Sequence, residues 1–322
     1  MVRSYCRFSL CAASLCLASC GGGGGTSVGI VTPPPPPPPP SSFPLVQSAS
    51  LATADSQLDY TTNLNGSFTV NKLNTSGQPS GLSINYDSAT GNYKVDDGTN
   101  SAIFTGASRS SAGYIDSYSS QSGTVTDKLN LYSNVRSGAS QTGAPVALTY
   151  LSYGSWSHTD SQNADTRVTD FIFGYPTAST DMPRSGTATY QTSVSGQELF
   201  NGYSPRLGQY DVGGSATLSA NFGTGAIDTT LQLQRTLDNG VIGTFTGSGT
   251  INSNQFTGTF SATDPNFQSG SFSGGFFGPQ AAEAGYTFSI RQHNPDPYGG
   301  AALPNLLDAW IVGTVVGKKS GN

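Results

Sequence analysis

The stretch that decides the fold is Asn254–Ile290, NQFTGTFSATDPNFQSGSFSGGFFGPQAAEAGYTFSI. Large apolar side chains recur in it with one parity, and Ser, Thr, Gly and Gln fill most of the positions between them. Such alternation indicates strands with one buried face, and the polar clusters between the runs indicate turns. The apolar residues of the common parity are Phe256, Phe260, Phe272, Phe276, Tyr286, Phe288 and Ile290. We therefore predict three consecutive strands, over 254–263, 268–278 and 284–290.

The same pattern continues in both directions from this stretch. Five further runs show it, at 185–194, 213–222, 226–236, 240–251 and 309–319. Eight antiparallel strands with a single apolar face can bury that face by closing on themselves, because the side chains just fill the interior of a barrel of that size. We predict an all-β chain in which residues 183–322 form an eight-stranded antiparallel up-and-down β-barrel.

A barrel that spans a membrane has the same alternation turned inside out, and it is the main structural alternative. The chain ends Gly317-Lys318-Lys319-Ser320-Gly321-Asn322, without the terminal aromatic residue usual in such barrels. The beginning of the chain also predicts a lipid anchor. Both features favour a barrel that does not lie in the bilayer.

Composition excludes two classes of protein. Gly contributes 41 of 322 residues and charged residues only 10%, a composition that disfavours helices and suits short strands with tight turns. Lys and Arg number 14 against 19 Asp and Glu, with a pI of about 4.8. Nucleic-acid binding needs a basic stripe, so we expect no nucleic-acid partner. A helical bundle is excluded as well.

The first residues are typical of a targeting signal. Arg3 and Arg7 precede a short apolar stretch, and Leu17-Ala18-Ser19-Cys20 resembles a bacterial lipobox. The resemblance implies a signal peptide over 1–19 and a lipid on Cys20, and Gly21, in place of Asp, implies export to the outer membrane. The alternative is an ordinary secretory peptide, which would leave Cys20 as a free thiol.

All four cysteines, Cys6, Cys11, Cys16 and Cys20, lie at or before that cleavage point. We therefore expect a mature chain without disulfides, thiol nucleophiles or thiolate metal sites. Residues 20–44 read as a tether. Within it, the unbroken run Pro33–Pro40 must form a polyproline II segment about 25 Å long, which would lift the folded part off the membrane.

Residues 45–182 also read as β-rich. The clearest unit is a hairpin, in which Leu82–Tyr86 and Tyr93–Val95 alternate on either side of a polar turn ending in Gly91. Further strands are predicted at 102–105, 128–132, 146–153 and 168–173. The segment Asp96–Asn100 lacks the ligand count of a calcium loop and is predicted to be a turn.

Several segments resemble transferrin-binding protein B. The most specific is Gly274–Gly285, GGFFGPQAAEAG, which is similar to part of the C-terminal barrel of that family. Others are Met182–Tyr190, Gly214–Phe222, Phe256–Phe260 and Gly313–Lys319, and Tyr86–Tyr93 resembles a hairpin of the preceding handle domain. The resemblance covers about residues 80–319 and implies that 45–182 is a handle domain.

The family implies a surface lipoprotein of a Gram-negative bacterium, with relatives that bind transferrin, haem or haemoglobin carriers, factor H or polyanions. Transferrin-binding protein B has two handle-plus-barrel lobes and this chain has room for one, so transferrin itself is not implied. In the glycine-rich segment, the residues read as structural: Gly274, Gly275 and Gly278 let backbones approach, Pro279 ends the ladder and Phe276 packs inward.

The candidate ligand site is formed by two predicted loops, Ser195–Val212 and Arg291–Asp308, at one end of the barrel. Both are longer than compact domains usually tolerate without a function, and we expect them at the mouth far from the handle. Aromatic residues and Arg dominate binding hot spots. The candidate residues are Phe200, Tyr203, Arg206, Tyr210, His293, Tyr298 and Leu303. The alternative is that each loop merely covers the core.

These features predict a binding protein and not an enzyme. The chain has no Gly-x-Ser-x-Gly, no His-Glu-x-x-His and no recognisable carboxylate pair. We predict a monomeric, lipid-anchored outer-membrane surface protein that binds a macromolecule or a small solute, with no cofactor and no metal. Two alternatives stay open: a haem scavenger that uses His293 as ligand, with His158 the only other histidine, and a passive shielding lipoprotein.

Overall fold

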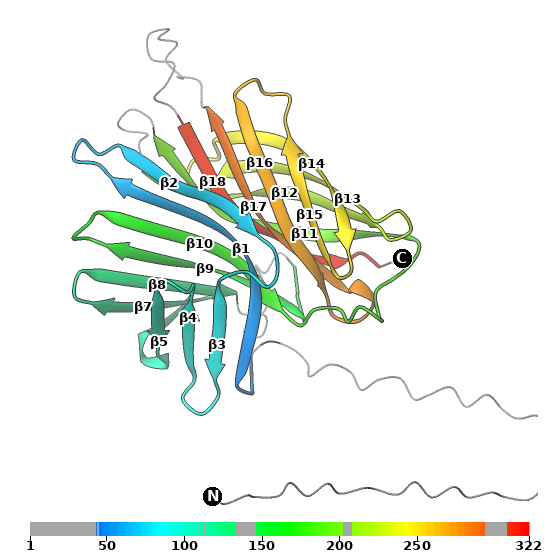
Figure 1. Cartoon of the computed structure of the whole chain (residues 1–322), viewed down its shortest axis with the longest axis horizontal. Coiled ribbons are helices and arrows are strands. Elements are labelled where there is room, and N and C mark those ends of the chain that lie inside the picture. Colours follow the sequence, from blue (N-terminus) through cyan, green and yellow to red (C-terminus); the bar gives the residue numbers. More distant parts are fainter. Residues whose placement is uncertain are drawn as a thin grey trace, which may run out of the picture. The chain divides into compact units, whose positions relative to one another are not determined.

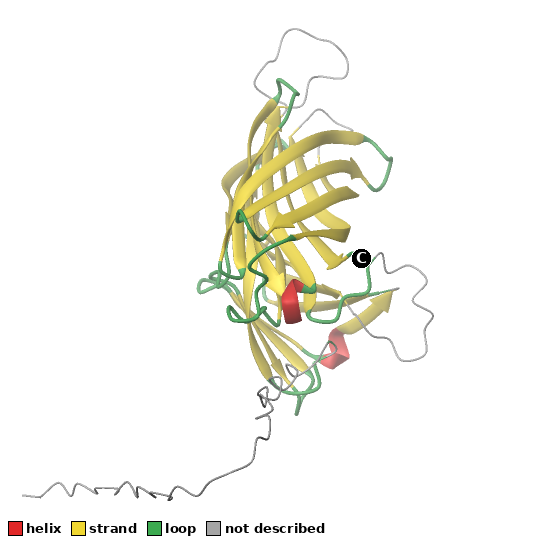
Figure 2. Cartoon of the chain, turned by 90° about the vertical axis from the view of Figure 1, so that its right-hand side faces the viewer, coloured by secondary structure: helices red, strands yellow, loops and turns green. Residues whose placement is uncertain are grey.

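The structure is a computed structural model, and it describes residues 43, 45–112, 114–132, 146–201, 208–293 and 308–321. The predicted signal peptide, Cys20 and nearly all of the tether lie outside these residues. Within the described part, no helix is long and apolar enough to cross a membrane. Nearly all of that part is strand, with two short helical turns at Gly106–Ser108 and Pro279–Ala281 (Figure 2).

The second half of the chain forms a closed eight-stranded barrel, as predicted (Figure 1). Each strand pairs antiparallel with the next, and the last pairs with the first through Tyr190↔Lys319 to Asn201↔Asp308. The strands are β11 (Thr187–Asn201), β12 (Gly208–Asn221), β13 (Ala226–Arg235), β14 (Val241–Asn252), β15 (Gln255–Ser261), β16 (Phe267–Phe277), β17 (Glu283–His293) and β18 (Asp308–Lys319).

The barrel interior holds the aromatic rings that the alternation placed on one face. Phe256, Phe272, Phe276, Tyr286 and Phe288 are each at most 1% exposed. The interior alternates large and small residues. At Gly258, for example, an added Cβ would lie 2.2 Å from the ring of Phe272, so this glycine provides the space that the ring occupies.

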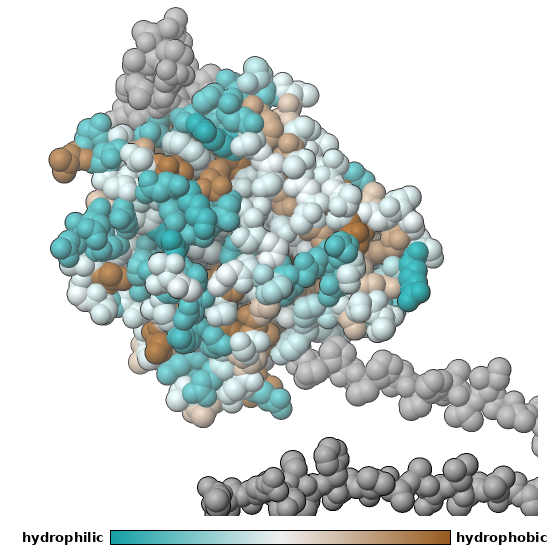
Figure 3. Space-filling view, viewed as in Figure 1, coloured by the Kyte–Doolittle hydropathy of each residue, from teal (hydrophilic) through white to brown (hydrophobic). Residues whose placement is uncertain are grey.

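The outer wall from β12 to β15 is polar. On β13 the outward positions are Asp228, Thr230, Gln232 and Gln234, which alternate with the buried Ile227, Leu231 and Leu233. A barrel that spans a bilayer needs an apolar outer band. The face of the molecule seen in Figure 3 shows only scattered apolar residues.

The first half of the chain forms a strongly curved ten-stranded sheet, called here the first sheet. Its order is β5-β4-β3-β1-β10-β9-β8-β7-β6, with β2 also paired to β1. Its strands are β1 (Ala49–Thr62), β2 (Phe68–Ser76), β3 (Ser83–Asp87), β4 (Asn92–Asp96), β5 (Ser101–Phe104), β6 (Arg109–Ala112), β7 (Ile115–Ser122), β8 (Val125–Tyr132), β9 (Leu151–Asp160) and β10 (Asp165–Gly174). An apolar core around Trp156, Phe104 and Phe171 fills its inner face.

The predicted hairpin is confirmed as β3 and β4, with Tyr86 opposite Tyr93. Residues 146–150, predicted as the start of a strand, precede β9 instead. The long strand β1 was not predicted. Its positions alternate between two buried faces, so that Thr53 and Asp55 are as buried as Ala54 and Leu58, and the contrast that marks a half-buried strand is missing.

The outer face of the first sheet packs against the barrel wall. Leu58 and Val168 of the sheet form one cluster with Leu199, Trp310 and Val312 of the barrel. A second cluster joins sheet residues to the barrel residues Phe277 and Val316. Strand β18 is therefore buried on both faces, as is β17 from Glu283 to Ile290. This explains why β18 reads as an almost continuous apolar run from Ala309 to Val316.

The glycine-rich segment joins the two halves. Gly278 has φ +70°, and an added Cβ would lie 2.2 Å from the ring of Tyr150, so only glycine fits. The hydroxyl of Thr177 donates to the carbonyl of Gly278 at 2.6 Å. The buried carboxylate of Glu283 accepts three backbone N–H groups, from Thr149 at 2.6 Å and from Tyr150 and Leu151 at 2.8 Å each. Phe276 packs inward, as predicted.

Candidate functional site

The strands at the candidate mouth are longer than the sequence predicted. β11 continues to Asn201 and β12 begins at Gly208, so most of the predicted loop Ser195–Val212 is strand. Phe200 and Tyr210 therefore lie in strands and not in a loop. The alternation of buried and exposed residues continues through this part of β11. One buried inward position is filled by the charged residue Glu198, so the apolar pattern that would reveal the strand is interrupted there. On the other predicted loop, β17 continues to His293 and β18 begins at Asp308.

Four of the seven candidate residues lie outside the described part of the chain. They are Tyr203, Arg206, Tyr298 and Leu303. Phe200 is buried at 2% exposure and Tyr210 is half-buried, and these two pack together with Ala309 inside the mouth. His293 is separate from this cluster.

A buried ion pair lies at the mouth and was not predicted. Arg235 of β13 contacts Glu198 of β11, with Nε to Oε2 at 2.5 Å and Nη2 to Oε1 at 3.1 Å. Its guanidinium also lies over two rings, 5.1 Å from the centroid of Phe200 and 4.8 Å from that of Tyr210. Arg235 shares the inward parity of Leu231 and Leu233 on β13, and Glu198 shares that of Ala188 and Tyr190 on β11. That parity was the available signal.

The ion pair of Glu198 and Arg235 lies inside the barrel at the mouth end and is almost completely buried. Glu198 is fully buried and Arg235 is 8% exposed. Burial alone would lower the pKa of Arg235, but the hydrogen bonds and charge of Glu198 raise it, so the guanidinium stays charged. Removing one partner of such a pair costs about 3–5 kcal/mol, because the other charge is left buried and unpaired. The mouth thus presents one guanidinium in contact with two aromatic rings.

His293 lies on the outside of the barrel. Because Ile290 is buried inside, Arg291 and His293 face outwards. The imidazole Nδ1 contacts Asp308 Oδ1 at 2.5 Å, and Arg291 Nη2 contacts the other oxygen of that carboxylate at 3.0 Å. The described surroundings of His293 are therefore polar, in contrast to the apolar neighbours expected for a haem ligand.

The mouth lies beside the first sheet and not far from it, which corrects the expected position. Asn201 exchanges two hydrogen bonds with the backbone of Phe68 on β2, each at 3.2 Å. The hydroxyl of Tyr60 donates to Gln209 Oε1 at 3.3 Å. The expected position rested on the first barrel strand beginning at the handle side, whereas β1 and β2 run along the wall of the barrel (Figure 1).

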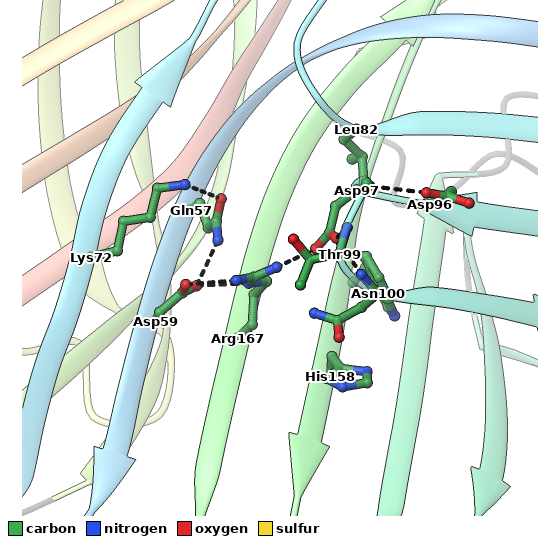
Figure 4. A network of polar contacts seen from close by, with 12 residues as sticks. Gln57, Asp59, Lys72, Leu82, Asp96, Asp97, Thr99, Asn100, His158 and Arg167 are labelled. Carbon is green, nitrogen blue, oxygen red and sulfur yellow. Dashed lines mark hydrogen bonds and ion pairs between the residues drawn. The ribbon is translucent and has the colours of Figure 1, made fainter.

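A second polar network lies on the inner face of the first sheet (Figure 4). Arg167 of β10 contacts Asp59 of β1 through Nε at 3.0 Å and Nη2 at 2.9 Å, and its Nη1 contacts Asp97 at 2.5 Å. Burial alone would raise the pKa of Asp97, but the backbone N–H of Asn100 and the guanidinium of Arg167 lower it. The network fixes the turn Asp96–Asn100, which confirms the prediction of a turn.

His158 is part of the same inner face. Its Nδ1 contacts Asp127 Oδ1 at 2.8 Å, and the same oxygen accepts the indole N–H of Trp156 at 3.0 Å. Among the described residues, no group of three or more His, Cys, Asp or Glu side chains is placed to hold a metal ion. The arrangement therefore reads as a buried carboxylate satisfied by two ring donors.

The comparison with known protein families finds a match, and it lies in the barrel half of the chain. Residues 182–302 match the family model described as the C-lobe and N-lobe beta barrels of Tf-binding protein B. A search of the curated proteins finds no match.

Three solved structures of transferrin-binding protein B are similar to this chain. A single-residue mutant from Haemophilus parasuis is 17% identical, with 84% of this chain and 46% of that chain covered and a TM-score of 0.45. One from Actinobacillus pleuropneumoniae is 14% identical, with 83% and 99% covered and a TM-score of 0.35. One from Neisseria meningitidis is 12% identical, with 86% and 77% covered and a TM-score of 0.32. This chain thus spans about half of the first of these proteins.

The family match covers the barrel strands β11 to β17, and it includes the segment Gly274–Gly285 that contacts the first sheet. Over residues 182–302, the second half of this chain is therefore similar to the beta barrels of Tf-binding protein B.

Proposed function

We propose that this protein is a non-enzymatic, lipid-anchored protein of the outer-membrane surface that binds a macromolecular or small-solute ligand at the mouth of its barrel. The observation that carries the proposal is the family match of residues 182–302, because proteins of this barrel type are named for binding another protein. The cation between two rings at the mouth supports it, since Arg and Tyr are the residues enriched in binding hot spots.

The proposed organisation follows the sequence. Residues 1–19 are a signal peptide, Cys20 carries the lipid, and 20–44 tether the folded part to the membrane. Residues 45–182 form the handle domain and 183–322 the barrel. The ligand contacts are proposed for Phe200, Tyr203, Arg206, Tyr210, His293, Tyr298 and Leu303. The protein acts as a monomer on the cell surface.

Two experiments test the proposal together. Protease shaving of intact cells should remove the protein, and full protection would contradict the surface location. The purified full chain, incubated with serum, should capture a ligand. Alanine at Tyr203 and Arg206 should weaken capture, whereas Thr224→Ala in a loop at the opposite mouth is the control and should not.

The other outcomes favour the two alternatives. If nothing is captured and the loops accept alanine without effect, the protein is a passive shielding lipoprotein. If haemin addition produces a Soret band that disappears in His293→Ala, the protein is a haem scavenger. Panels of ester and glycoside substrates should show no turnover.

A further inference from the structure

A polar groove lies between the first sheet and the barrel, beside their apolar contact. Its volume is about 630 Å³, within the range of small-molecule sites. Strands β8, β9 and β10 form one side and strands β11 and β12 the other. It is distinct from the mouth described above, because its residues lie on the outer wall of the barrel.

The side of the groove that the first sheet forms is lined by hydrogen-bonding side chains of neighbouring strands. The cross-strand pairs Asn130↔Ser155, Lys128↔Ser157 and Thr126↔Thr159 stand side by side on β8 and β9. They alternate with the buried Leu129 and Trp156, whose side chains pack into the apolar core on the opposite face of the sheet. The amide nitrogen of Asn130 donates to Ser155 Oγ at 3.3 Å and its oxygen accepts from Ser117 at 2.7 Å, so the amide is held in one orientation.

The barrel wall carries Gln197, Gln209 and Asp211. Gln209 donates to the side-chain oxygen of Gln197, and it accepts the hydroxyl of Tyr60, which bridges the two walls at 3.3 Å. Both amides are thus oriented before any ligand arrives, which lowers the entropic cost of binding.

The chemistry of this lining selects one class of ligand. Among the described residues that line the groove, every side chain ends in a hydroxyl, an amide or a charged group, and the one cation, Lys128, is balanced by the one anion, Asp211. A charged ligand would have no net counter-charge, and an apolar one would leave the polar groups unpaired, at about 1–3 kcal/mol each. A neutral molecule with many hydroxyls matches, because each hydroxyl both donates and accepts, as Ser, Thr, Asn and Gln require.

We propose that this groove binds a short neutral saccharide, held between the Ser, Thr and Asn side chains of β8 and β9 and the glutamines of β11 and β12. A free sugar and a sugar chain carried by a protein share this chemistry. A free saccharide and a protein-linked one would contact the same polar side chains in the groove. Lys128, Gln209 and Asp211 are exposed at its rim, where a longer sugar chain can extend out of the groove.

The test uses the full chain with lactose, maltose and N,N′-diacetylchitobiose, each free and coupled to albumin, followed by saturation-transfer NMR and calorimetry. Ser157→Phe fills the groove with a ring on a strand that tolerates aromatic residues, and it should weaken binding at least about tenfold. Gln197→Ala removes one hydrogen-bonding side chain and should weaken binding about five- to tenfold. Ser157→Thr keeps the hydroxyl and should bind.

The matched control is Ser248→Phe, at an exposed position on β14 of the barrel outside the groove. It should leave binding unchanged, as should Tyr203→Ala, at a ligand contact of the proposed function, which separates the two sites. Binding of the free sugar or only of the albumin conjugate supports the proposal when Ser157→Phe removes it. Failure of every probe to bind, or equal binding by Ser157→Phe folded as judged by circular dichroism, would overturn it.

Discussion

Asp170 of β10 gives the sharpest prediction, because it is a carboxyl group buried where the first sheet meets the barrel. It is 4% exposed, and within the described part of the chain its Oδ2 has no hydrogen-bond partner. Burial, with a smaller contribution from the charge of Asp211, raises the pKa of Asp170 to about 8. In the unfolded chain the same group has a pKa of about 3.9.

The sign of the effect follows from proton linkage. The folded chain binds the Asp170 proton more tightly than the unfolded chain does, so stability falls as pH rises between the two pKa values and levels off above about pH 8. Each pH unit costs about 1.4 kcal/mol, and the whole interval gives an upper limit of about 6 kcal/mol. Asp170→Asn keeps the shape without the titration, so we expect it to be more stable than the natural protein at pH 7 by up to about 4 kcal/mol.

Urea unfolding followed by the fluorescence of Trp156 and Trp310 measures this difference, since both indoles are buried. The difference between the two proteins should be small near pH 4 and grow up to about pH 8. Asp160→Asn is the control, because the backbone N–H of Gln162 lowers the pKa of this exposed carboxyl; its effect should be confined to acid pH. Parallel pH profiles for the natural protein and Asp170→Asn would refute the reasoning.

Three further changes test the contacts described above. Glu283→Ala leaves three buried backbone N–H groups without an acceptor, so urea titrations should show a free energy of unfolding lower by about 3–5 kcal/mol. A loss below about 1 kcal/mol would contradict the role of this carboxylate. Gly278→Ala should lower the melting temperature more than Gly91→Ala does, because both have positive φ but only the first places a Cβ against a ring; equal losses would disprove the clash. Arg235→Met should destabilise the barrel by about 3–5 kcal/mol, and adding Glu198→Leu should restore most of the loss; no recovery in the double variant would show that the unpaired charge is not the cause.

The barrel could be predicted because most of its strands have one apolar and one polar face. Leu231 and Leu233 alternate with outward glutamines, and such contrast fixes both strand type and closure. The hairpin of β3 and β4 has the added signal of its turn. In these places local pattern and global fold agree.

The burial of β1, the ion pair at the mouth and the polar groove could not be predicted, because they depend on contacts between segments far apart in the chain. β1 is buried on both faces because it lies between the inner core and the barrel, which no local pattern reports. Glu198 and Arg235 occupy inward positions that apolar residues usually fill, and they are tolerated only because each neutralises the other. The polar groove arises from two walls that meet only after folding.

The double burial of β17 and β18 has a consequence for how the chain can be divided. A fragment beginning near residue 183 would keep every barrel strand, yet it would expose to water the apolar side chains that the first sheet covers, Trp310, Val312, Val316 and Phe277. Such a fragment is expected to self-associate or to need a cover. The two halves differ in topology, but because they share this apolar contact we expect them to fold as one unit.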